Sequence, residues 1–183
     1  MTMVDHETGL YTKEAFQRLL AEDVEQAARD GDSYAVVACL PRKLPPEGVA
    51  DVVTPVARSV RGVLRKSDLA TLLNDEVLVV GAPQTPEAAA QVVAHRLKSH
   101  LGLRSAHWRN ITWEAGVACL PGDGASAEEL LQAAIDAAVA SRRVIALNGG
   151  PAPWLLITPR AVDPDASYAL QRKGNERPGR DGS

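Results

Sequence analysis

Apolar residues recur along the chain at two spacings, and each spacing predicts one type of secondary structure. Over 13–30 they recur every three or four positions, after Thr12, which can act as an N-cap, and before Gly31, which can end a helix. This pattern predicts an amphipathic helix. The stretch SYAVVACL, 33–40, is apolar almost throughout and predicts a central strand that is buried on both faces.

A second helical stripe covers 49–64 but contains a proline. Proline costs about 3 kcal/mol inside a helix and little in its first turn, so we expect a kinked or divided helix that restarts with Thr54 as cap and Pro55 at N1. The runs LATLL and EVLVVGA then flank Asn74 and Asp75, which tolerate the positive φ of a primed turn. These two runs predict a β-hairpin.

The second half of the chain continues the alternation. The sequence Thr-Pro-Glu at 85–87 supplies an N-cap, an N1 proline and an early acid for a third helix. ITWEAGVACL, 111–120, predicts a strand, and the capping-box pattern S-x-x-E at 126–129 predicts a helix over 127–142. The short runs VIAL and WLLIT, on either side of NGGPAP, predict a closing hairpin.

The predicted order is helix, strand, helix, hairpin, helix, strand, helix, strand, which is typical of an α/β sandwich with a central sheet. With 183 residues and 45% hydrophobic content, the chain can bury one sizeable core. We expect one domain over 1–160 and a disordered polar tail over 161–183.

Composition narrows the classes of partner. A net charge of -3 and a pI near 5.8 give no general attraction to nucleic acid or to anionic membranes. No run is long enough to span a bilayer and the N-terminus lacks a signal-peptide pattern, so we expect a soluble cytoplasmic protein. Cys39 and Cys119 each lie in an apolar run and are expected to be buried free thiols in a reducing compartment.

Four segments together resemble the GGDEF domain, the catalytic domain of diguanylate cyclases. DHETGLYTKEAF, 5–16, resembles the opening motif D-x-L-T-G-L-x-N-R-x-x-F, and 65–78 resembles R-x-x-D followed after five residues by G-G-D-E-F. ITWEAGVACLP resembles v-T-v-S-x-G-v-a-x-x-P. AEELLQAAIDAAVASRR resembles the helix L-L-x-x-A-D-x-A-L-Y-x-A-K, with Ile135 in place of aspartate. The resemblance covers about 5–150 and implies a nucleotidyl-cyclase-like α/β sandwich whose central, mainly antiparallel sheet is surrounded by helices.

The signature motif itself is degenerate. In the ungapped alignment its five positions hold Asn74, Asp75, Glu76, Val77 and Leu78. Both glycines, which let backbone amides approach phosphates, are replaced, and so is the fourth-position acid. Glu76 remains as the third-position metal acid. A one-residue slip would match Asp75 and Glu76 to the D-E pair but requires a deletion after Asp68, so we favour the ungapped alignment.

The first strand departs further from the family, whose motif there is D-x-D-x-F-K. The corresponding region has no carboxylate between Ser33 and Pro46, and Ala38 or a near neighbour replaces the first metal aspartate. Members of the family join two GTP molecules into cyclic di-GMP, a reaction that needs metal-bound carboxylates, and Glu76 alone cannot supply that cage. We therefore predict no catalytic residue and no metal. The alternative is a weakly active cyclase in which Asp75 and Glu76 hold Mg²⁺.

Arg65 and Asp68 keep the spacing of the family's product-inhibition site. The resemblance implies that the arginine binds the O6/N7 edge of a guanine of cyclic di-GMP and that the aspartate accepts the guanine N–H groups. The alternative is an i,i+3 ion pair at a helix end. The sequence thus predicts an inactive module of bacterial signalling that senses cyclic di-GMP or binds a protein partner or a second copy of itself. A scaffold that binds no nucleotide is a further alternative, and neither nucleic acid nor membrane is expected as a partner.

Overall fold

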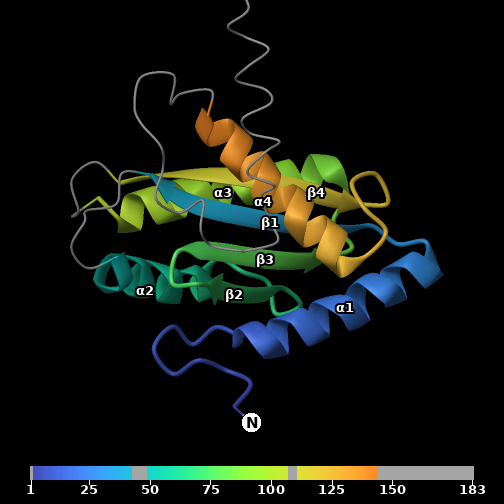
Figure 1. Ribbon diagram of the computed structural model, residues 1–183, viewed down its shortest axis with the longest axis horizontal. Helices are drawn as coiled ribbons and strands as arrows, with labels where there is room; N and C mark the ends of the chain where they lie inside the picture. The colour runs from blue at the N-terminus through green and yellow to red at the C-terminus, as the bar shows by residue number, and fades with distance from the viewer. Residues whose placement is uncertain (1, 43–48, 107–110, 144–183) are drawn as a thin grey trace, which may run out of the picture. The chain divides into compact units, whose positions relative to one another are not determined.

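The computed structural model describes residues 2–42, 49–106 and 111–143. The chain divides into two compact units, Met1–Asn148 and Gly149–Ser183, and all the described residues belong to the first (Figure 1). The closing hairpin and the polar tail predicted from the sequence lie outside the described residues.

The elements of the first unit follow the predicted order. They are α1 (Lys13–Asp30), β1 (Tyr34–Arg42), α2 (Val49–Ser59), the short 3-10 helix η1 (Val60–Gly62), β2 (Leu69–Leu73), β3 (Val77–Pro83), α3 (Glu87–Arg104), β4 (Thr112–Leu120) and α4 (Ala127–Arg143). The strands form one antiparallel sheet in the order β2-β3-β1-β4. The strand predicted to be central, β1, lies inside the sheet and is buried along almost its whole length.

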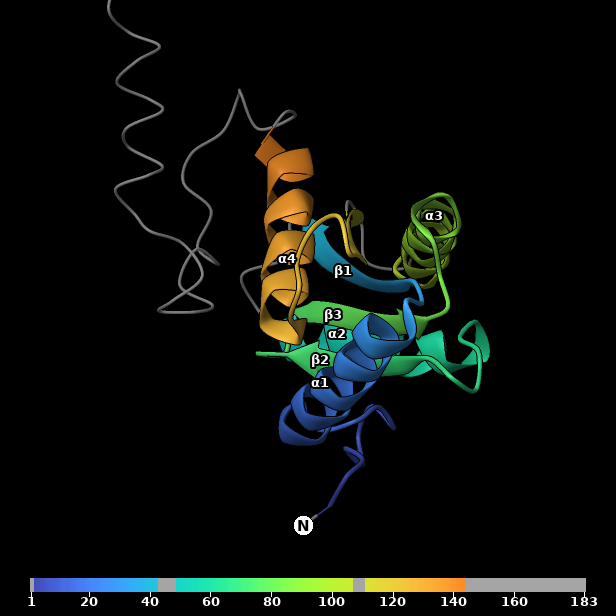
Figure 2. The same cartoon turned by 90° about the vertical axis from the view of Figure 1, so that its right-hand side faces the viewer.

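Helices cover both faces of this sheet, which confirms the predicted α/β sandwich (Figure 2). On one face, α2 and α3 pack over Val37 and Cys39 of β1. On the other, α4 approaches β4 so closely at Gly116 that a Cβ there would collide with the backbone of Ala134 and Ala138. None of the described helices combines the length and the apolar composition needed to cross a bilayer.

The predicted helix caps at α1 and α4 are present. Thr12 accepts a hydrogen bond from the N–H of the third helical residue, and Gly31 ends α1 in the left-handed conformation, with φ of 73°. Ser126 accepts from the N–H of Glu129 at 3.2 Å. The carboxylate of Glu129 accepts from the backbone of Ala125 at 2.7 Å, one residue before the cap.

The prediction that the second helix restarts at Thr54 is wrong. One helix, α2, runs through Pro55, and the irregular turn comes later, at η1. Pro55 lies on the exposed side, where water can satisfy the carbonyl that a proline leaves without an N–H donor. The buried side chains of Val53 and Val56 continue the apolar stripe across it. Packing of that stripe therefore offsets the local cost of the proline.

The prediction that Thr85 caps α3 is wrong by one residue. Pro86 occupies the N-cap position, and its carbonyl accepts the hydrogen bond of Ala90 at 2.9 Å. Thr85 is buried, and its hydroxyl donates to the carbonyl of Pro83 at 2.9 Å. The side chain thus closes the turn out of β3 and does not cap the helix.

An N-terminal arm, residues 4–11, lies against the outer edge of β2. The N–H of Tyr11 donates to the carbonyl of Ala70 at 2.9 Å, and the hydroxyl of Thr71 donates to the carbonyl of Tyr11 at 2.8 Å. Tyr11 also bridges back to Val4. These contacts satisfy backbone groups of β2 that a bare sheet edge would leave unpaired.

Both cysteines are free and buried, as predicted. Burial raises the pKa of the Cys39 thiol to about 12, and Lys98 opposes this shift only in part. Burial also raises the pKa of Cys119, with Asp123 and Glu87 adding to it. Because the thiolate is the reactive form, neither sulfur is poised as a nucleophile.

Candidate nucleotide site and signature turn

The hairpin predicted around Asn74 and Asp75 is present. Leu73 pairs with Val77, and between them Asn74 and Asp75 adopt φ of 48° and 59°. The N–H of Glu76 donates to the carbonyl of Leu73 at 3.1 Å and closes the turn. Positive φ at both central positions is the conformation of a primed turn, which matches the twist of the two strands.

Only the first three positions of the signature remnant, residues 74–78, reach the surface. Asn74 and Asp75 are exposed and Glu76 is half-buried. Val77 and Leu78 are 2% and 0% exposed, and Leu78 packs in the core beneath α2 and α3. The two carboxylates that this turn can offer to a ligand are therefore those of Asp75 and Glu76.

The neighbouring part of β1, residues 38–40, is apolar, and Arg42 at the end of the strand pairs with Glu114 at 3.1 Å. Cys39 pairs with Leu78, so this end of β1 lies beside the signature turn. Ala38 is fully buried between Val79 and Gly116, and Leu40 is buried as well. Within the described ranges no group of three His, Cys, Asp or Glu side chains could hold a metal ion. The donor set at this end of the sheet does not fit a two-metal centre.

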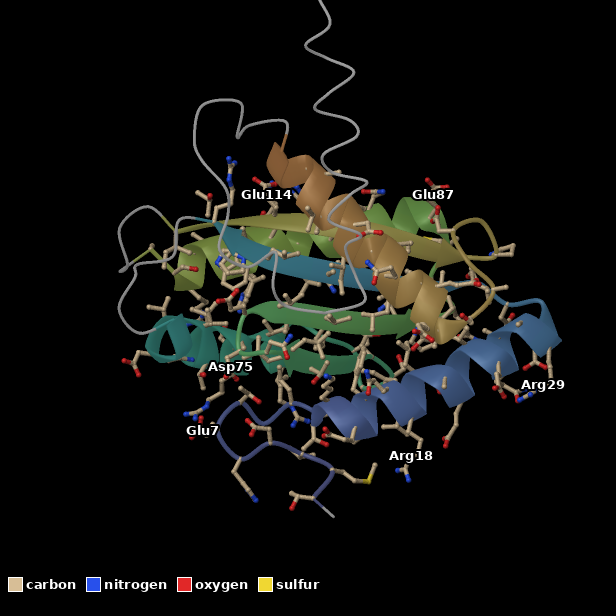
Figure 3. All side chains as sticks on the ribbon, in the orientation of Figure 1. Glu7, Arg18, Arg29, Asp75, Glu87 and Glu114 are labelled. Atoms are coloured by element: carbon tan, nitrogen blue, oxygen red, sulfur yellow. The ribbon has the colours of Figure 1, made fainter. Side chains whose placement is uncertain are left out.

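A pocket of about 190 Å³ adjoins the turn, and no sequence motif predicted it. Its lining includes Asp5, Glu7 and Asp75, and Figure 3 shows Asp75 at the end of the hairpin on the same side as Glu7. Asp5 accepts hydrogen bonds from both the N–H and the hydroxyl of Thr8 at 2.7 Å, and these bonds lower its pKa. Its carboxylate therefore stabilises its own loop.

Two arginines fix the same loop from outside. Arg58 of α2 donates to the carbonyl of Glu7 at 2.5 Å, and Arg61 of η1 donates to the carbonyl of Gly9. Both bonds join segments about 50 positions apart in the sequence. The pocket wall beside the turn is thus held by tertiary contacts with no local sequence signal.

Arg65 and Asp68 form a separate turn at the opposite end of β2. The Oδ2 atom of Asp68 accepts from the N–H of Arg65 at 2.8 Å, and the N–H of Asp68 donates to the carbonyl of Arg65 at 3.2 Å. The Arg65 side chain is exposed. Among the described residues no ion pair joins the two side chains. The alternative prediction of an ion pair at a helix end is therefore wrong, because the carboxylate closes the turn through the backbone.

The second carboxylate oxygen of Asp68 is the unusual atom of this turn. Oδ1 is buried and has no hydrogen-bond partner among the described residues. A buried acceptor without a donor costs about 1–3 kcal/mol relative to one that is satisfied. A donor from a ligand could satisfy this oxygen only if the turn rearranges to expose it.

Tyr34 lies near this carboxylate and was not identified from the sequence. Its side chain is fully buried, and its hydroxyl donates to Asp23 of α1 at 3.2 Å. Burial, and then the negative charges of Asp23 and Asp68, raise the pKa of Tyr34. A Cβ at Gly81 would lie 2.6 Å from this hydroxyl. The glycine therefore gives the tyrosine its space.

The structure is similar to solved domains of one kind. One is the GGDEF domain of FimX from Pseudomonas aeruginosa, with a TM-score of 0.65 and 18% identity over 79% of this chain and 96% of that chain. Another is the GGDEF domain of DgcB from Caulobacter crescentus in complex with c-di-GMP, with a TM-score of 0.63 and 22% identity over 78% of this chain and 88% of that chain. The chain has the fold of a GGDEF domain.

A third similar structure has a protein partner. It is the diguanylate cyclase SiaD from P. aeruginosa in complex with its activator SiaC, with a TM-score of 0.64 and 21% identity over 79% of this chain and 59% of that chain. No protein-family model matches the sequence, and no curated protein matches it. The likeness to GGDEF domains is therefore one of fold, and function has to be argued from this chain's own side chains.

Proposed function

We propose that this chain is a catalytically inactive GGDEF-like domain that binds cyclic di-GMP at the turn formed by Arg65 and Asp68. The observation that carries the proposal is the buried, unpartnered Oδ1 atom of Asp68 next to the exposed Arg65. Guanine offers N–H donors to a carboxylate and two adjacent acceptors, O6 and N7, to a guanidinium. One guanine base therefore complements both side chains of the turn.

The likeness to DgcB supports the same ligand, since that GGDEF domain was solved in complex with c-di-GMP. Two hydrogen bonds between Arg65 and Asp68, one accepted by the Asp68 carboxylate and one by the Arg65 carbonyl, fix the shape of the turn before any ligand arrives. A preformed backbone turn loses less conformational entropy on binding, and binding then requires the Asp68 carboxylate to turn so that Oδ1 reaches the ligand.

Inactivity is supported at the other end of β2. Ala38 or a near neighbour stands where the resemblance places the first metal aspartate, and Val77 where it places the fourth-position acid. Ala38 and Val77 are both buried among apolar side chains. The turn geometry favours the ungapped alignment, because Asn74 and Asp75 have positive φ at the two positions assigned to glycines. Their side chains occupy space that a phosphate-cradling turn leaves open.

Calorimetric titration of cyclic di-GMP into the protein tests the receptor proposal. We expect micromolar binding that is lost in Arg65→Ala/Asp68→Ala. Lys66→Ala is the matched control, since it removes an exposed cation from the same turn and should change the affinity by less than a factor of about three. Absence of heat with the unmodified protein would overturn the proposal and leave the scaffold, for which the SiaD–SiaC complex offers a precedent of fold.

A weakly active cyclase is the second candidate, because Asp75 and Glu76 lie at the turn and Asp75 lines the adjoining pocket. Incubation with GTP and Mg²⁺ or Mn²⁺ distinguishes it from the receptor. We expect no cyclic di-GMP after prolonged incubation. Cyclic di-GMP formation that disappears in Glu76→Gln would show that the turn holds a metal. The proposal that the domain is inactive would then be wrong.

A further inference from the structure

The side chain of Tyr34 crosses the sheet from β1 toward the start of β2. Its hydroxyl lies over Gly81 of β3, where a Cβ would be 2.6 Å from the oxygen. Gly81 pairs with Leu69, which is the first residue of β2 and the neighbour of Asp68. Paired residues of an antiparallel sheet have Cα atoms about 5 Å apart. The hydroxyl therefore lies close to the turn that Asp68 closes.

Two carboxylates act on this one hydroxyl. It donates to Oδ2 of Asp23 at 3.2 Å. Burial raises the pKa of Tyr34 most, and the negative charges of Asp23 and Asp68 add to the shift. Asp23 belongs to α1, which packs along β2 (Figure 2). Because a hydroxyl has one proton to donate, Tyr34 can satisfy only one of the two carboxylates at a time.

In the structure the hydroxyl is bound to Asp23, and one oxygen of Asp68 has no donor. Oδ2 of Asp68 accepts from the N–H of Arg65, but Oδ1 is buried and has no hydrogen-bond partner among the described residues. A buried acceptor without a donor is destabilising. Rotation of the carboxylate toward solvent or a ligand would remove that cost. The bond between Tyr34 and Asp23 thus leaves Asp68 ready to turn outward.

We infer that Asp23 keeps Asp68 available to the ligand by holding the hydroxyl of Tyr34 away from it. Without the acceptor on Asp23, the hydroxyl is free to donate to Oδ1 of Asp68, which would satisfy this oxygen inside the protein and hold it there. A ligand would then have to displace that bond. Asp23 is therefore a positioning residue that acts through Tyr34. This control rests on the proposed function, which supplies the ligand.

Calorimetric titration of cyclic di-GMP into Asp23→Ala tests the inference. We expect the affinity to fall about tenfold, because the ligand has to displace a hydrogen bond to a charged group. Tyr34→Phe should bind as tightly as the unmodified protein, since it also leaves Oδ1 of Asp68 without a donor. Asp23→Ala/Tyr34→Phe should bind equally tightly. A general loosening of the fold would instead leave the double variant as weak as Asp23→Ala, and that result would overturn the inference.

Glu22→Ala is the matched control. Glu22 is exposed beside Asp23 on α1, and its charge also acts on the Asp23 carboxyl. The variant therefore removes a negative charge from the same place without freeing the hydroxyl of Tyr34, and its affinity for cyclic di-GMP should be unchanged. Equal losses of affinity in Glu22→Ala and Asp23→Ala would assign the effect to charge alone, against the inference.

A measurement without ligand separates this inference from the proposed function. In the Asp23→Ala background Asp68 gains a bond from Tyr34, so Asp68→Ala should lower the urea midpoint of unfolding further there than in the unmodified protein. Equal losses in the two backgrounds would show that the hydroxyl does not transfer, and the inference would be wrong. If the unmodified protein binds no cyclic di-GMP, the proposed function fails, and the urea midpoints alone decide whether Tyr34 is shared between the two carboxylates.

Discussion

The two ends of β2 differ in the polar groups that they offer. At the hairpin end, Asn74 and Asp75 adopt positive φ, and residues 38–40 of the adjacent β1 are apolar and buried. At the other end, the carboxylate of Asp68 closes a turn with the backbone of Arg65. Backbone shape and ligand chemistry are therefore separable, because strand pairing fixes the first and a few exposed side chains decide the second.

Burial explains why a metal-binding carboxylate would be hard to introduce into β1 beside the hairpin. Ala38 is 0% exposed and lies between Val79 and Gly116, close to the backbone of α4. A carboxylate placed there would lose its hydration without gaining a partner. By contrast, Arg65 is exposed and Asp68 is half-buried, so the Arg65–Asp68 turn lies nearer to solvent.

Restoring an acid at the hairpin end should produce the greatest loss of stability. Ala38→Asp is expected to lower the free energy of unfolding by more than about 3 kcal/mol, measured by urea denaturation, because it buries an unpaired carboxylate. Ala38→Asn is the control of similar size without charge and should cost less. Equal stability of Ala38→Asp and the unmodified protein would mean that this end of the sheet tolerates a metal ligand.

Removing the acid at the other end should affect binding more than folding. Asp68→Ala is expected to weaken cyclic di-GMP binding by about 10- to 100-fold, since hydrogen bonds to charged groups contribute about 1.5–3 kcal/mol. Calorimetry gives the affinity, and thermal unfolding reports the small effect of losing the bond to Arg65. Asp75→Ala at the hairpin end is the matched control. An equal effect of the two changes would contradict the division between the ends.

Gly81 tests whether the core beside Asp68 is tightly packed. Gly81→Ala is expected to destabilise by about 1–3 kcal/mol, because the added methyl group would meet the Tyr34 hydroxyl, which lies 2.6 Å from the Cβ position. Tyr34→Phe removes that hydroxyl and should recover part of the loss. A double-mutant cycle of unfolding free energies measures this coupling. If the effects of the two changes on the unfolding free energy simply add, the added methyl group does not press on the Tyr34 hydroxyl.

Asp5 should show that an acid near the hairpin end serves the fold. Hydrogen bonds from Thr8 lower its pKa from 3.8, so its ionised form is stabilised in the folded state. That contribution is present above about pH 4 and is lost as pH falls through the lowered pKa. Asp5→Asn should therefore be less stable than the unmodified protein at pH 7, and the difference should shrink at pH 3. A constant difference would assign the loss to packing alone.

Much of the fold could be predicted because its signals are local. Thr12 and Gly31 bound α1, and Ser126 marks the start of α4, as their side-chain and backbone preferences require. The prediction that the helix restarts at Pro55 was wrong because the local cost of a proline is smaller than the gain from burying valines on either side of it. Here tertiary packing decided where the helix was interrupted.

The site was predicted less completely, for the same reason. The spacing of Arg65 and Asp68 singled out the two residues but not the turn that they form, because an ion pair and a hydrogen bond from backbone to carboxylate have the same spacing in sequence. The contacts of Tyr34 with Asp23 and near Gly81 join three separate elements. No periodicity or motif reports such contacts.

The N-terminal arm on β2 has a practical consequence for handling the protein. Tyr11 of the arm bonds to Ala70 and Thr71 of β2, a strand that would otherwise be an open edge of the sheet. An open edge is a template for the strands of other molecules and a starting point for aggregates. A shortened form beginning at Thr12 would keep every helix and strand, yet we expect it to precipitate on storage while the intact chain stays clear.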